Sequence, residues 1–171
     1  AKLNELFNTP DLIQTGPRSL AELRAPDNTI TRVGSNTIFS YARSGRTVNL
    51  QTGSLLFHSP RGKGGGVIKT KAASASVLGT TLIVSATTDG GFKCVVLEGK
   101  AALQMPNGNY RVARPGQVVF VQSGGDSFGP TVDINLEKLV EGSNLVESFE
   151  KELPSLPKIK KAVTTQKEQI T

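Results

Sequence analysis

The sequence predicts an all-β fold, an irregular twisted β-solenoid or sandwich of about a dozen short strands, followed by a C-terminal helical tail. Three observations predict it. Runs rich in Val, Ile and Thr alternate with polar residues, as strands with one buried face do. Gly, Pro, Asn and Asp separate these runs roughly every 8–12 residues, which is typical of sandwiches and barrels. Apolar residues take up a helical spacing only near the C-terminus.

The centre of this pattern is the stretch 76–85, where two β-branched and aliphatic runs meet at Gly79. Glycine inside such a run marks a bulge, a bend or a close backbone approach. We therefore predict that Gly79 is the corner at which one strand hands over to the next. A related pattern, glycine followed by one polar and three apolar residues, recurs at 53–57, 99–103 and 116–120. Recurring corners are typical of strands that wrap around one core.

The chain begins with an arm, residues 1–10, in which the spacing of Leu3, Leu6 and Phe7 fits either an extended segment or a short helix. The β domain follows over residues 11–132. Its hairpin signals are Asp89-Gly90-Gly91 and Asn107-Gly108. The expected strands are, in order, 12–15, 19–24, 29–33, 37–41, 46–50, 54–58, 67–70, the central stretch 76–85, 92–97, 101–103, 110–112 and 118–121.

A helical extension is expected over residues 133–171. A first helix ends at Gly142, Ser143 caps a second, and the break 154–157 separates a last amphipathic helix. Its apolar stripe could not be stable alone in water and must dock on a protein surface. We expect that surface to be the β body of its own chain, with a neighbouring copy as the alternative. The candidate docking residues are Phe149, Leu153, Ile159, Val163 and Ile170.

Composition argues against catalysis and against a cofactor or metal. Cys94 and His58 are each the only residue of their type, so the sequence offers no disulfide and no zinc-ligand spacing. The glycine-rich loop 60–66 precedes a strand rather than a helix, unlike a phosphate-binding loop. No apolar run is long enough to cross a membrane. The first residues lack the regions of a signal peptide, so we expect either a cytosolic protein or a form from which the signal has been removed.

Charge is uneven along the chain. No acid lies between Asp27 and Asp89, an interval that holds seven basic residues, Arg32 among them. A field of one sign favours a polyanion or an acidic protein surface, although a solvated face with counterions is the plainer interpretation. Nucleic acid is disfavoured, because the few aromatic residues there are expected in the core. The candidate polyanion-binding residues are Arg43, Arg46, Arg61, Lys63, Lys69 and Lys71.

Residues 15–122 resemble the FecR domain of extracytoplasmic signalling proteins. The residues that carry the resemblance are Thr15-Gly16, Ala21-Glu22-Leu23, Ile30, Ser35-Asn36, Val48 to Gly53, Val67 to Thr70, Val77 to Thr80, Ile83-Val84, Val95 to Gly99 and Pro115-Gly116-Gln117. The resemblance implies a solenoid-like β domain in the periplasm or outside the cell, with a binding or scaffolding role. Iron-signalling members carry an anti-sigma segment and a membrane helix before this domain. Neither is recognisable here, so iron uptake and sigma-factor control are not carried over.

Two functions from different classes follow. The first is a non-enzymatic, extracytoplasmic binding module that engages another protein or an acidic envelope glycan. The alternative is a structural subunit that assembles with copies of itself into an extracellular polymer, because sheet edges expose unpaired backbone groups.

Overall fold

The computed structural model describes residues 2–8, 11–43 and 46–170. Its described elements are, in chain order, β1 (Leu12–Gln14), β2 (Ala21–Arg24), β3 (Ile30–Val33), β4 (Ile38–Tyr41), β5 (Thr47–His58), β6 (Gly66–Lys69), β7 (Ser74–Val77), β8 (Thr81–Ala86), β9 (Phe92–Glu98), β10 (Ala101–Gln104), β11 (Tyr110–Ala113), β12 (Gln117–Val121), β13 (Val132–Asp133), α1 (Leu136–Gly142), α2 (Asn144–Glu147) and α3 (Leu156–Ile170). The predicted class, mostly β with a C-terminal helical tail, is confirmed.

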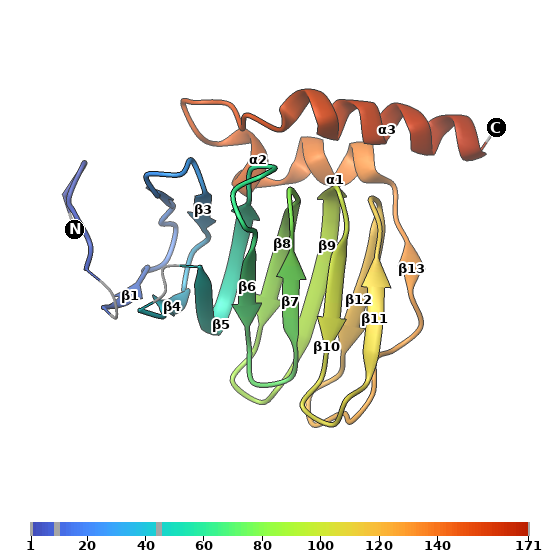
Figure 1. Cartoon of the computed structure of the whole chain (residues 1–171), viewed down its shortest axis with the longest axis horizontal. Coiled ribbons are helices and arrows are strands. Elements are labelled where there is room, and N and C mark those ends of the chain that lie inside the picture. The colour runs from blue at the N-terminus through green and yellow to red at the C-terminus, as the bar shows by residue number, and fades with distance from the viewer. Residues whose placement is uncertain (1, 9–10, 44–45, 171) are drawn as a thin grey trace.

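The strands form one curled sheet that folds over into two layers, because the long strand β5 belongs to both. The front layer in Figure 1 has the order β1-β4-β5-β6-β7-β10-β11. The back layer has the order β2-β3-β5-β8-β9-β12-β13. Neighbouring strands are antiparallel except β5 and β6, which are parallel. β8 and β9 form the hairpin predicted at Asp89-Gly90-Gly91, and β10 and β11 form the one predicted at Asn107-Gly108.

Glycine corners carry the chain from one layer to the other, as the sequence predicted. Gly79 joins β7 in front to β8 behind, and Gly99 joins β9 behind to β10 in front. Both have positive φ, +65° and +82°, a conformation that a residue with a Cβ adopts at a cost. The corners in β5 and before β12 share it, at Gly53 and Gly116. The recurring pattern therefore marks the layer changes.

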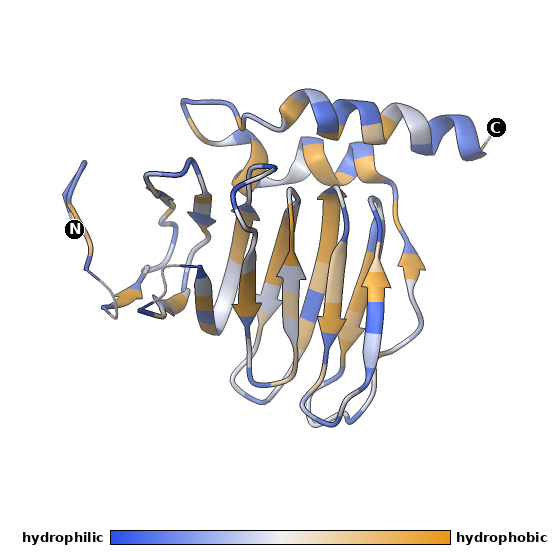
Figure 2. Cartoon of the chain, viewed as in Figure 1, coloured by the Kyte–Doolittle hydropathy of each residue, from blue (hydrophilic) through white to orange (hydrophobic). Residues whose placement is uncertain are grey.

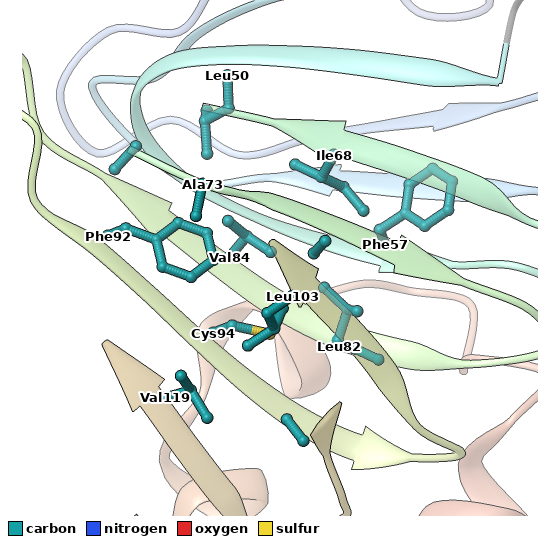
Figure 3. Close-up of a cluster of buried hydrophobic side chains, with 14 of the residues drawn as sticks. Leu50, Phe57, Ile68, Ala73, Leu82, Val84, Phe92, Cys94, Leu103 and Val119 are labelled. Carbon is teal, nitrogen blue, oxygen red and sulfur yellow. The ribbon is translucent and has the colours of Figure 1, made fainter. Parts of the chain in front are cut away.

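The main core lies between the two layers. Alternate residues of each strand point into it, which is why Leu82 and Val84 of β8 face inward with Cys94 of β9 (Figure 3). Phe39 and Phe57 are also buried there, as expected from the sequence. Apolar residues run along the strands of both layers in Figure 2. The thiol of Cys94 is fully buried, and burial raises its pKa to about 12.

The helices cover the outer face of the back layer, across one end of its strands (Figure 1). A second apolar cluster forms there between Ile83, Val95 and Leu97 of the sheet and residues of all three helices. Asn135 begins α1 by accepting a hydrogen bond from the Lys138 backbone at 2.9 Å. Ser143 precedes α2 as expected, but its side chain makes no capping hydrogen bond. β8 and β9 are therefore buried on both faces except at Ser85 and Lys93.

The part of the arm that the structure describes, residues 2–8, is not helical. It lies to the left of the strands in Figure 1. Its first residues form a turn, in which the Glu5 N–H donates to the Lys2 carbonyl at 3.2 Å and Asn4 has a φ of +62°, so the arm is neither a helix nor extended throughout. None of the helices in the described part of the chain is long and apolar enough to cross a membrane.

Candidate ligand-binding groove

An open hollow of about 460 Å³ lies at the end of the sandwich where the chain turns at Gly79 and Gly99. Three glycines are part of its lining. The Thr80 hydroxyl donates to the Lys100 carbonyl at 2.8 Å, so the two corners cross each other directly. A Cβ on Gly99 would lie 2.9 Å from the Gly79 carbonyl oxygen, closer than such atoms approach. The residues that line this groove are Arg61, Gly62, Leu78, Gly79, Gly99, Lys100, Arg114 and Pro115.

The groove is positively charged. Arg61, Lys100 and Arg114 come from three separate connections between strands, and all three are exposed. None of them belongs to an ion pair among those found in the described residues. Leu78 is 69% exposed beside them. The groove therefore offers three cations that belong to no ion pair found in the described residues, next to an apolar side chain and three glycines.

A buried polar cluster lies close to the groove, around the hydroxyl of Thr81. This oxygen is 2.9 Å from His58 Nδ1, 2.8 Å from Glu98 Oε1 and 2.7 Å from Ser155 Oγ. Because a hydroxyl has one proton, Thr81 can donate only one of these bonds and must accept the others. Ser155 immediately precedes α3, so the cluster fastens the last helix to the sheet. All four side chains are buried, which closes the cluster to a substrate.

Burial decides the protonation of this cluster. It lowers the pKa of His58 to about 4, and the positive charge of Lys158 acts in the same direction. Burial also raises the pKa of Glu98, although the Thr81 hydrogen bond and the charges of Lys158 and Arg61 oppose it. His58 is thus neutral at neutral pH and serves as a hydrogen-bonding core residue.

Arg32 does not contribute to the basic surface expected from the sequence. Its side chain is completely buried and ties the tail to the β domain. Nε donates to Glu22 Oε2 at 2.8 Å, and Nη1 donates to the carbonyls of Leu145 and Val146 at 3.0 Å each. Nη2 donates to the Lys151 carbonyl. The field interpretation is wrong for this residue, because β3 turns it toward the helices instead of solvent.

The other basic candidates are spread over two ends of the front layer. Arg61 lines the groove, and Arg43 is exposed just beyond β4. Arg46 holds the glycine-rich loop by donating to the Lys63 and Gly65 carbonyls, and its guanidinium lies 3.6 Å from Asp27. Lys63 is exposed on that loop, whereas Lys69 and Lys71 are exposed at the opposite end of β6.

Sequence reasoning missed Lys100 and Arg114, because both lie outside the acid-free interval. A signal for them existed. Lys100 follows the corner glycine Gly99 directly, and Arg114 stands two residues before Gly116. Whether any of these cations binds a polyanion stays a prediction.

The docking candidates of the tail differ in burial. Leu153 and Ile159 are buried against the back layer, and Val163 packs half-buried beside them. Phe149 is half-buried with its ring 4.4 Å from the Arg32 guanidinium. Ile170 is 77% exposed. The tail thus packs on its own chain along α3 as far as Gln166 and Lys167, which bond to Leu136 and Glu137, and Ile170 lies beyond that contact in solvent.

Comparison with known proteins assigns the fold. Residues 11–102 match the family described as FecR protein. The chain belongs to the FecR family. The predicted resemblance to FecR domains is therefore confirmed.

Solved structures show the same FecR fold. Two crystal structures of a proposed anti-sigma factor from Parabacteroides distasonis, at 2.50 and 1.65 Å resolution, superpose with a TM-score of 0.66 and 19% sequence identity. The alignment covers 77% of this chain and 65% of theirs, so this chain spans about two thirds of that protein. No curated protein matches the sequence.

Proposed function

We propose that this FecR protein is a non-enzymatic, extracytoplasmic binding module that holds an acidic segment of a partner protein in the groove. The observation that carries the proposal is the convergence of Arg61, Lys100 and Arg114 on the crossing corners. Arginine side chains bind carboxylates through two parallel hydrogen bonds, which gives such a site direction as well as charge. Membership of the FecR family supports a location outside the cytoplasm and a protein partner.

The composition of the groove favours a protein segment over an acidic glycan. A sugar polyanion would use the cations but would leave the exposed side chain of Leu78 without a contact. A peptide that carries an apolar residue beside its carboxylates would use both. Apolar side chains at the centre of a contact contribute much of the binding free energy, whereas exposed ion pairs contribute little.

The lining residues do not support a reaction at this site. They are three cations, a leucine, a proline and glycines, without a nucleophile or a base. The nearby His58, Glu98 and Ser155 are enclosed and are engaged with Thr81. These groups support binding and fastening rather than catalysis.

The test is a titration with a fluorescent peptide of alternating Glu and Leu residues, with heparin as a second probe. Lys100→Glu combined with Arg114→Glu should weaken peptide binding by about tenfold or more, on the order of 1.4 kcal/mol. Lys69→Glu combined with Lys71→Glu changes the charge equally at the far end of β6 and should have a much smaller effect.

Raising the salt concentration should weaken binding, because the contacts are exposed ion pairs. An equal loss in both double variants would contradict a local groove and favour a general basic field. Binding of heparin without binding of the peptide would show that the groove takes a glycan instead.

A further inference from the structure

The two lateral edges of the sandwich, along its outermost strands, differ in how the main core is covered. At the edge formed by β11 and β13, the segment that leads into β13 places Phe128 in the main core. Arg111 holds this segment by donating to the Gly129 carbonyl at 2.9 Å and to the Thr131 hydroxyl at 3.0 Å. Asn107 and Asn109 both donate to the Asp126 carbonyl. At this edge Phe128 therefore covers the main core, and the hydrogen bonds to its segment hold it in place.

At the other edge, where β1 and β2 lie, Tyr41 closes the main core: its ring packs edge-on against Phe39, and its hydroxyl lies 2.5 Å from that of Thr31 in the other layer. β1 pairs only with β4, and β2 pairs only with β3, so each leaves one backbone edge free. Ile13, Ala21 and Leu23 pack against the main core but are only half-buried. Outside Tyr41, the apolar residues of these two strands are therefore only partly covered.

An apolar segment lies next to this edge. Within the arm, Leu3 is 94% exposed, Leu6 is 91% exposed and Phe7 is 42% exposed. These values show that the body of the same chain does not cover them. Lys2 and Glu5 are the charged residues of the described arm and cancel each other, with the Lys2 backbone donating to the Glu5 carboxylate. The arm is thus an apolar segment without net charge that its own chain leaves exposed, next to strands whose apolar residues are only partly covered.

We propose that the arm of one copy covers this edge of a second copy, and that the exchange is reciprocal. Phe7 and Leu6 would cover the half-buried side chains of Ile13 and Leu23 on β1 and β2. The arm leaves the β body at the edge where β1 and β2 lie. When two copies meet by this edge, the arm of each therefore covers β1 and β2 of the other, and the contact closes as a two-fold dimer. Growth into a polymer would require the arm and the surface that it covers to lie on opposite sides of the chain.

Sedimentation equilibrium of the 171-residue chain over a wide concentration range measures the assembly. The expected limiting mass is about 36 kDa, twice the 18.1 kDa of one chain. Leu3→Asp combined with Leu6→Asp should give a folded protein of single-chain mass, with an unchanged melting temperature in dilute solution. The matched control is Leu78→Asp combined with Ile170→Asp, which changes two exposed apolar side chains elsewhere on the chain, 69% and 77% exposed, and should keep the pair.

A cross-linking experiment places the arm directly. A chain with Leu6→Cys is mixed with a chain with Leu20→Cys, at the start of β2, and oxidised. The proposal expects a disulfide between the two chains, and the buried Cys94 does not compete. Single-chain mass at every concentration overturns the proposal, as does a pair that survives Leu3→Asp with Leu6→Asp. Continued growth beyond two copies overturns the closed exchange in favour of a polymer.

Discussion

Replacing Arg32 by methionine tests how the helical extension is held. The substitution keeps most of the side-chain volume but removes the charge and every hydrogen-bond donor of the guanidinium. Glu22 then keeps only Arg24, 2.7 Å away and largely exposed. Three backbone carbonyls of the tail lose their donor, and the ring of Phe149 loses the cation that stacks on it. No other described element donates to those carbonyls.

The expected loss of stability is about 3–5 kcal/mol, the range for breaking a buried ion pair from one side. Summing a charged hydrogen bond of about 1.5–3 kcal/mol for each contact would give more. The smaller loss of about 3–5 kcal/mol applies because the segment 147–152 is mostly exposed, so water can hydrate its carbonyls once the arginine is gone. A loss of about 4 kcal/mol lowers the urea midpoint by about 2 M if the denaturant slope is about 2 kcal/mol per molar.

The assay is urea unfolding followed by circular dichroism, with Arg24→Met as the matched control. Arg24 contacts the same carboxylate from an exposed position and should contribute less than about 1 kcal/mol. The hydrogen bonds from Arg32 and Arg24 keep the pKa of Glu22 below its ordinary 4.5, although burial acts to raise it. Stability from this pair is therefore present above pH 4.5 and lost on acidification. Equal losses for Arg32→Met and Arg24→Met would refute the clamp.

Three further predictions concern the corners, the polar cluster and the tail. Gly99→Ala should cost about 3 kcal/mol or more, because its Cβ meets the Gly79 carbonyl oxygen. Gly108→Ala, with similar φ but open space, should cost about 1–2 kcal/mol in the same thermal melts. Between pH 6.5 and about 4 the wild-type protein should lose stability, because the unfolded state binds a proton at His58 and the folded state does not. His58→Gln should remove this part of the loss, which thermal melts over a pH series measure. Deleting residues 155–171 should lower the melting temperature without changing the number of copies in the assembly; a changed number of copies with unchanged stability would place the tail on a neighbour instead.

The sequence alone determined the fold class and the places where the chain changes layer. Both depend on local properties. Alternation with a period of two follows from the strand itself, and positive φ at Gly79 and Gly99 follows from the absence of a Cβ. The change to a helical spacing after residue 133 is equally local. These signals are readable because each needs only a few neighbouring residues.

Only the tertiary structure decided which residues meet. Arg61, Lys100 and Arg114 converge because the corners at Gly79 and Gly99 cross, which brings together side chains from as far apart in the sequence as residues 61 and 114. Arg32 is a surface charge by composition and a buried clamp in the fold, since its partners lie 113 residues or more along the chain. A pattern of alternation cannot say what covers its outward face. The physical reason is that long-range packing is chosen by the whole chain, and a polar residue on a strand turns outward only where no other segment covers it.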